Sequence, residues 1–518
     1  LFDCEDGNFQ VTWSGAVDLT ESIKIGIGTT VSITGDYISD VVDPTGDVST
    51  SGGSDASTEA AIVNDGSSAA VALNDFGPVF VVIGGALSLD GIAVRNGNAG
   101  LTTGDKLSSG GGIYAYFANI TVNGCAFEKN YADFAGGGIF ANHSRVEVRD
   151  TAFRECWAGP VPQAGDEDVT SAGGGIMVNF TDLLVDKCLF DNCFAGNKGG
   201  GVHVANGKFS MLKSTFIDNT AGSNNVESEE AIGEGGDLVV TACVSSFDNV
   251  GVCGVNDSSF AHGFVARKGG SVALATGFLG ASYVEFHRCE FHNSTAGISI
   301  EDDPQGEGGV FSVGAGTTLV VVDSVVTEAY AGKKGGAIAI SGGDDWVEDP
   351  GGIVILRNST FAESMAVRDT GGVIYCNERT VVTIAGNENN FLNNVGGSDG
   401  AVLAATTVTK VFVEGGTFIG NSADENGGVL WSMGDVTISD GLFIGNTASD
   451  GGGVFYASEQ SIIIVEGGNF GGENAAQDGG VGFVSEGSRL FINGGTFSGN
   501  EADNGGGAFY AEDNTTFV

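Results

Sequence analysis

Apolar and polar residues alternate over short stretches of the chain, and most of these stretches end in turn residues. The clearest examples are residues 381–386, 410–415, 461–467 and 489–494, which are rich in valine, isoleucine and phenylalanine and end in glycine. Side chains on a β-strand point to opposite faces with a period of two. These stretches therefore predict short β-strands that are separated by turns.

Two short motifs recur between these strands. In one, a phenylalanine is followed three residues later by asparagine, and in the other a glycine pair or triplet precedes an aliphatic residue, as at 136–139 and 451–454. The two motifs alternate along most of the chain. The residues expected to form ladders are Phe127, Phe153, Phe190, Phe216, Phe391, Phe418, Phe443 and Phe497, with Asn130, Asn219, Asn394, Asn421, Asn446 and Asn500.

The best-kept period of the repeat is 25 to 27 residues, measured between phenylalanines from 391 to 497. Self-similarity at this period indicates a solenoid, and a glycine pair in every unit costs a helix about 2 kcal/mol per repeat. We therefore predict an all-β fold, a right-handed parallel β-helix of about 15–18 coils with three short strands each. Stacked coils place the phenylalanines in an inward aromatic ladder, and the asparagines hydrogen-bond from turn to turn.

The joint pattern of the two motifs over residues 105–518 resembles the repeats of the chlamydial polymorphic outer membrane proteins and related β-helix surface proteins. This resemblance implies the β-helix fold and a role as a secreted, surface-displayed adhesin. The same motifs occur in uncharacterised eukaryotic proteins, notably algal ones, so the resemblance does not imply a bacterial source.

The repeat divides the chain into two parts. Residues 1–104 follow the pattern loosely and predict irregular N-terminal capping coils that continue into the regular repeats of residues 105–518. Insertions near 158–171, 221–234 and 297–307 leave from one corner, and a fourth near 342–352 leaves from another edge. Loops that stack on one corner are a usual place for the contacts of a solenoid.

Composition limits the possible partners. The 518 residues include 66 acidic and 21 basic side chains, and the formal net charge is −45. Such an excess of carboxylates repels nucleic acids and anionic lipid surfaces, so we expect neither as a partner. A hydrophobic content of 42% is enough for a large core. The sequence has no uninterrupted run of eighteen apolar residues, so we expect no membrane-spanning segment.

Acidic clusters lie in the predicted insertions. Because Ca²⁺ prefers six to eight oxygen ligands, the carboxylates there are candidate ligands for a structural Ca²⁺, although none has EF-hand spacing. The candidates are Asp166, Asp168, Asp302, Asp303, Asp344 and Asp345. The densest group of other reactive side chains is 287–293, where alternation predicts His287, Cys289 and Phe291 on one face. We find no convincing catalytic constellation and expect no other cofactor.

Nine cysteines fall into groups by their position in the repeat. Cys156 and Cys193 each follow a ladder phenylalanine by three residues in consecutive coils, so stacking predicts a disulfide between them. Cys243 and Cys253 form a second candidate pair. We predict that Cys125, Cys188 and Cys289 are buried thiols. Cys4 and Cys376 have no visible partner in the sequence.

Sequons for N-linked glycosylation occur at Asn119, Asn142, Asn179, Asn256, Asn293, Asn358 and Asn514. Asn142 and Asn179 hold equivalent positions in neighbouring coils, so they are predicted to stack on one outer corner. If the protein is eukaryotic and secreted, N-linked glycans would project from that corner. The expected location of the protein is extracellular or at the cell surface.

The interpretation favoured by these patterns is an extracellular structural protein, a rigid rod in a filament, flagellar hair or surface layer. Its last repeat stops in mid-coil at Val518, and docking of such ends would let the rod associate with itself or with other surface proteins. Two alternatives stay open. One is a surface adhesin of the polymorphic outer membrane protein type, and the other is a polysaccharide-binding or polysaccharide-processing β-helix.

Overall fold

The structure is a computed structural model. It describes residues 3–4, 8–12, 16–19, 23–34, 70–73, 77–100, 108–159, 171–222, 233–243, 253–277, 282–297, 306–342, 351–485 and 487–518. Most of each of the four predicted insertions lies outside these residues. The side chains of the first 22 residues are described only at Phe9 and Gln10.

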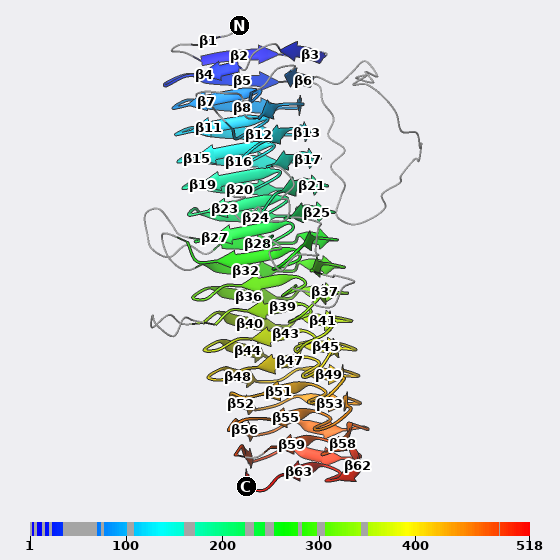
Figure 1. Ribbon diagram of the computed structural model, residues 1–518. Coiled ribbons are helices and arrows are strands. Elements are labelled where there is room, and N and C mark those ends of the chain that lie inside the picture. Colours follow the sequence, from blue (N-terminus) through cyan, green and yellow to red (C-terminus); the bar gives the residue numbers. More distant parts are fainter. Residues whose placement is uncertain are drawn as a thin grey trace, which may run out of the picture.

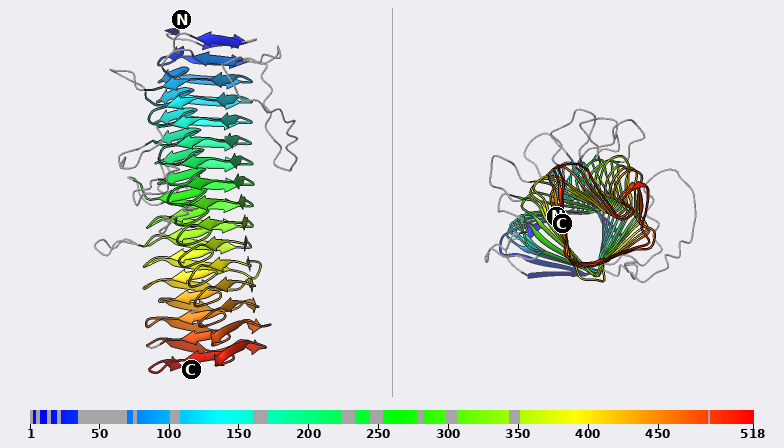
Figure 2. Two further views of the ribbon diagram at one scale, coloured as in Figure 1. Left: turned by 45° about the vertical axis from the view of Figure 1, so that its right-hand side comes forward. Right: turned by 90° about the horizontal axis from the view of Figure 1, so that it is seen from below.

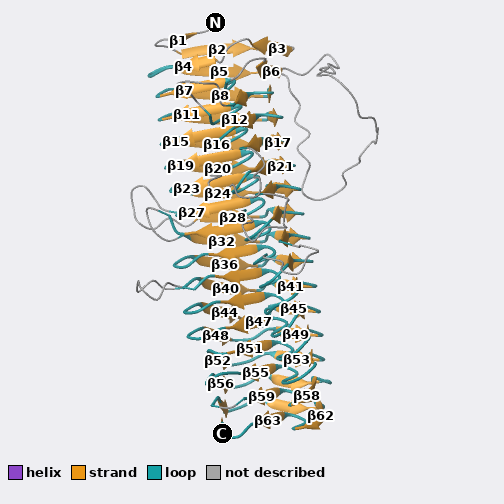
Figure 3. Ribbon diagram, viewed as in Figure 1, coloured by secondary structure: helices purple, strands orange, loops and turns teal. Residues whose placement is uncertain are grey.

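The described strands form one straight column of coils, with the two chain ends at opposite ends of the column (Figure 1). All strands pair in parallel and form four sheets, A to D, with 17, 17, 16 and 14 strands. Sheets A, B and C run the length of the column, whereas sheet D begins at β10 (Asn98–Ala99). The sheets surround one core when viewed along the axis (Figure 2). The described residues contain strands and turns but no helix (Figure 3). The predicted right-handed parallel β-helix is therefore confirmed.

One coil shows how the sequence builds the repeat. Strand β11 (Ile113–Tyr116) belongs to sheet A, β12 (Asn119–Asn123) to sheet B, β13 (Ala126–Glu128) to sheet C and β14 (Tyr131–Ala132) to sheet D. Sheets A, B and C correspond to the three strands expected in each coil. Sheet D consists mainly of two-residue strands, which are too short for alternation of side chains to reveal them in the sequence.

The glycine triplet sits where the chain turns from sheet D into sheet A. Gly136 has a φ of 63°, a left-handed conformation that glycine adopts without steric cost. A Cβ atom on Gly138 would lie 2.8 Å from Cδ1 of Phe153. The first glycine therefore permits the turn, and the third leaves room for the phenylalanine ring of the coil that the triplet opens.

The N-terminal strands continue the same sheets. Strand β4 (Ile23–Ile25) pairs with β7 (Phe80–Ile83), which pairs with β11. Strand β5 (Thr30–Thr34) pairs with β8 (Ala86–Asp90), which pairs with β12. The described parts of residues 1–104 thus form coils of the column.

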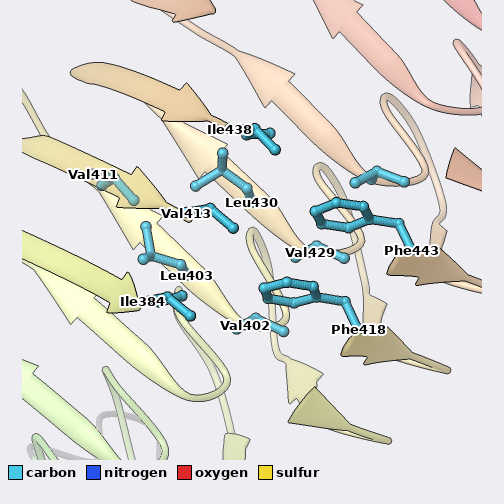
Figure 4. Close-up of a pocket in the computed structure, with 11 residues that line it drawn as sticks. Ile384, Val402, Leu403, Val411, Val413, Phe418, Val429, Leu430, Ile438 and Phe443 are labelled. Atoms are coloured by element: carbon cyan, nitrogen blue, oxygen red, sulfur yellow. The ribbon is translucent and has the colours of Figure 1, made fainter. Parts of the chain in front are cut away.

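The interior is filled by aliphatic and aromatic side chains along its whole length. One cluster of buried residues extends from Ile23 to Leu490. Near the C-terminal third, the rings of Phe418 and Phe443 lie one above the other beside Leu403 and Leu430 (Figure 4). The cavity among them measures only about 10 Å³ and is lined by apolar side chains. It has no room for a substrate or ligand.

Candidate functional site

Two columns of stacked phenylalanine rings line the inner face of sheet C. Ring centroids within each column lie 4.5–5.5 Å apart. Val326 stands between the columns, because it pairs with Phe291 on one side and Phe361 on the other. The first column contains Phe127, Phe153, Phe190, Phe216, Phe260 and Phe291, and the second contains Phe361, Phe391, Phe418, Phe443, Phe470 and Phe497.

All eight phenylalanines expected from the sequence lie in these columns. Four further members, Phe260, Phe291, Phe361 and Phe470, were missed because neither the asparagine nor the cysteine of the predicted members follows them three residues later. The residues at that position are Gly263, Ser294, Ser364 and Glu473. The spacing from the neighbouring motifs would have identified these four phenylalanines.

A column of buried asparagines runs beside the second phenylalanine column. The side chains of Asn394, Asn421, Asn446, Asn474 and Asn500 form a chain in which each Nδ2 donates to the next Oδ1 at 2.9–3.0 Å. Each Nδ2 also donates to a main-chain carbonyl one coil earlier, as from Asn421 to Phe391 at 3.0 Å. Asn394, Asn421, Asn446 and Asn474 are fully buried, and both of their amide hydrogens are thereby satisfied. Asn500 at the end of the column is half-buried. Asn474 was missed because one extra residue separates it from Phe470.

The predicted disulfide between Cys156 and Cys193 is wrong, since both residues are buried free thiols. They do occupy the asparagine position in consecutive coils. In-register parallel strands hold equivalent side chains about 4.8 Å apart and pointing the same way, whereas a disulfide needs Cβ atoms about 3.8 Å apart. Each sulfur instead lies against the carbonyl of the phenylalanine one coil earlier, at 3.4 Å for Cys156 and 3.5 Å for Cys193.

In a coil nearer the middle of the rod, an acidic side chain takes the place of the asparagine side chain. Gly263 holds the asparagine position, and its missing side chain leaves space that the fully buried carboxyl of Asp237 fills. Oδ1 of Asp237 accepts a hydrogen bond from Nδ2 of Asn219 at 2.9 Å. Burial raises the pKa of Asp237 to about 7. A carboxyl that ionises near neutral pH therefore sits inside the rod.

Cys243 and Cys253 are joined by a disulfide, with their Cα atoms 6.0 Å apart. Cys243 follows β27 (Leu238–Thr241) of sheet A, and Cys253 opens β28 (Cys253–Asn256) of sheet B. The bond therefore ties together the ends of a connection between two sheets of one coil.

Loss of this bond is expected to destabilise the middle of the rod. For a closed loop of this length, replacing Cys243 by serine should lower the free energy of unfolding by about 2–3 kcal/mol. Denaturant unfolding of the parent and of Cys243→Ser measures the difference. A reducing agent should lower the free energy of unfolding of the parent and leave that of the variant unchanged. An equal decrease in both proteins would contradict the disulfide between Cys243 and Cys253.

The other described cysteines are buried thiols. Burial raises the pKa of Cys125, Cys188, Cys289 and Cys376 to about 12. A thiol of such high pKa carries almost no thiolate at neutral pH, so these residues act as small apolar side chains. Cys4 lies in β1 (Asp3–Cys4), and its side chain is outside the described set.

The segment 287–293 does not assemble a reactive site. The prediction that His287 shares a face with Cys289 and Phe291 is wrong, because Arg288 has a φ of 50° and turns the chain between the two strands. Cys289 and Phe291 point into the core, whereas His287 lies outside and contacts Glu285 at 3.0 Å. Among the described residues, no group of three or more metal-ligating side chains is brought together.

The candidate Ca²⁺ ligands lie outside the described residues. This applies to all six carboxylates, Asp166, Asp168, Asp302, Asp303, Asp344 and Asp345. Their role stays a prediction from the sequence.

The sequon asparagines lie on the outside of the coils. Asn142 and Asn179 are register partners at the corner between sheets A and B. At the same corner, the ring of His143 stacks on that of Phe180 with the centroids 4.9 Å apart, and the tilted ring of Phe117 lies on its other side at 5.0 Å. Of the other sequon residues, Asn256 is half-buried, and those that are exposed are Asn119, Asn293, Asn358 and Asn514. Glycans on Asn142 and Asn179 would therefore project from one edge of the rod.

Comparison with known proteins supports the fold. Residues 81–249 match the family model described as a right-handed beta helix region. Searches of curated proteins and of solved structures find no match. The matched segment includes β8 to β27 and thus the first four members of the first phenylalanine column. No helix in the described part of the chain is long and apolar enough to cross a membrane.

Proposed function

We propose that this chain is an extracellular structural protein, a rigid β-helical rod that forms or decorates a filament, a flagellar hair or a cell-surface layer. The observation that carries the proposal is the unbroken register of the coils. Seventeen strands of sheet A at about 4.8 Å per step span about 77 Å, and every step adds main-chain hydrogen bonds and core contacts along the axis. Such a body resists bending because every bend would stretch several sheets at once.

Two features support the extracellular part of the proposal. The Cys243–Cys253 disulfide is typical of proteins that fold in an oxidising compartment. The sequons on the outer corner at Asn142 and Asn179 lie where glycans would not disturb the core. Glycans there would also keep that edge of the rod free of contacts.

Electron microscopy of the native specimen tests this function. We expect linear or layered assemblies in which the repeat along the axis matches the length of the rod. Dispersed monomers at high concentration would contradict the proposal. Monomers that bind a cell surface or a polysaccharide would instead favour the adhesin or the polysaccharide-binding alternative.

A further inference from the structure

The outer face of sheet B changes character along the rod. In β12, β16 (Arg145–Arg149) and β20 (Asp182–Asp186), the outward side chains are mainly charged or polar. Six consecutive strands near the C-terminal end differ: β40 (Ile353–Arg357), β44 (Val381–Ala385), β48 (Lys410–Val413), β52 (Asp435–Ile438), β56 (Ile462–Val465) and β60 (Arg489–Ile492). Their central outward row combines four large apolar side chains with two threonines, whereas the same row in β12, β16 and β20 holds Thr121, Glu147 and Leu184.

This row is defined by its register, and we call it the sheet B strip. It consists of Ile355, Thr383, Phe412, Thr437, Ile464 and Phe491, each paired with the next. None of the six side chains is fully buried, and Phe412 is 39% exposed. The other five side chains are partly buried, and four of the six are large and apolar. Neighbouring apolar side chains on the outer face of a sheet mark a candidate contact surface.

From this surface we infer that the sheet B strip is a lateral contact between two copies of this chain, which pack side by side with opposite axial directions. The inference rests on the proposed structural function and names the surface that such an assembly would use. Charge supports a second copy as the occupant. The whole chain has about three acidic residues for each basic one, whereas the two rows that flank the strip carry three of each kind. The basic side chains are Arg357, Lys410 and Arg489, and the acidic ones are Glu414, Asp435 and Glu466. Two acidic rods therefore repel each other less at this surface than elsewhere.

The order of residues along the strip is self-complementary. A twofold axis that runs along the strand direction between β48 and β52 places β48 of one copy opposite β52 of the other. Lys410 then faces the second copy's Asp435, and Phe412 faces the second copy's Thr437. The next pair outward is Thr383 with the second copy's Ile464, so large side chains meet small ones near the axis. The outermost pair, Ile355 with the second copy's Phe491, brings two large apolar side chains together.

The size of the strip sets the strength of the contact. Six strands at about 4.8 Å spacing and about four residues at 3.3 Å cover about 300 Å². A stable complex usually buries about 800 Å² on each partner. One contact is therefore weak, and it becomes effective when rods already held in a filament or layer repeat it.

Sedimentation velocity over a concentration series tests this contact. We expect reversible dimers of the parent at high concentration, and at least tenfold weaker association in Thr437→Glu and Phe412→Glu. Thr121→Glu is the matched control, because Thr121 holds the same row of the same sheet outside the strip and is exposed. Lys410→Asp and Asp435→Lys should each weaken dimers, and the two together should restore them. Unchanged circular dichroism spectra show that the variants fold.

Two outcomes would overturn the inference. One is a parent that stays monomeric at every concentration, which would leave the strip to a different partner. The other is equal association of Thr437→Glu and Thr121→Glu. Microscopy of the same variants separates this failure from failure of the proposed function. Assemblies that persist in Thr437→Glu contradict only the lateral contact. Absence of assemblies in the parent contradicts the structural function itself.

Discussion

Replacing Phe418 by alanine is expected to lower the free energy of unfolding by about 3–5 kcal/mol, because the ring is fully enclosed between two others. Phe418 is 1% exposed, and its centroid lies 4.8 Å from that of Phe391 and 4.7 Å from that of Phe443. Surrounding strands are fixed by their ladders and cannot collapse into the space. Denaturant unfolding measures the loss.

Phe412→Ala provides the matched control for this prediction. Phe412 lies in the same coil but on the outer face of sheet B. Its removal should cost less than about 1 kcal/mol, since little buried area is lost. Hydrogen exchange should localise the effect of Phe418→Ala to the coils on either side, because each coil of a solenoid contacts only its neighbours. Equal losses in the two variants would mean that the phenylalanine column does not hold the coils together.

Replacing Asp237 by asparagine is expected to stabilise the protein at pH 8 and to have little effect at pH 4. The pKa of Asp237 is raised from 3.8 to about 7 in the folded chain. The folded state therefore holds a proton that the unfolded state loses above about pH 4, so this group's contribution to stability declines as the pH rises from about 4 to about 7. The difference between variant and parent at pH 8 should be on the order of 2–4 kcal/mol.

Unfolding curves at several pH values measure this difference. Asp503→Asn is the control, because Asp503 is exposed and its replacement changes the net charge by the same amount. Two results would contradict the raised pKa of Asp237. One is an Asp237→Asn variant that is no more stable than the parent at pH 8, and the other is an equal gain in stability at pH 4.

The sequence predicts the fold well because each repeat of the motifs corresponds to one coil of the backbone. A parallel coil places each residue above its counterpart, so motifs such as Gly136–Ile139 and Phe153 report the register directly. The same reasoning fails where a coil has a different residue type at a motif position. Cys156 and Cys193 take over the hydrogen bond of an asparagine, and stacking alone does not tell this role from a disulfide.

The parts that the sequence did not reveal depend on packing between coils. The role of Asp237 follows only once Gly263 is seen to leave a space beside it. The sheet B strip likewise becomes visible only when register joins Ile355 to Phe491 across six strands. Neither feature has a local motif, because its members are about one repeat or more apart in the chain.

The central claim is that the coils stack in one continuous register along the axis. An experimental density map at side-chain resolution tests it most directly. We expect the rings of Phe391, Phe418, Phe443, Phe470 and Phe497 in a single column with steps of about 4.8 Å. Rings that diverge from one axis, or helical density between them, would contradict the account.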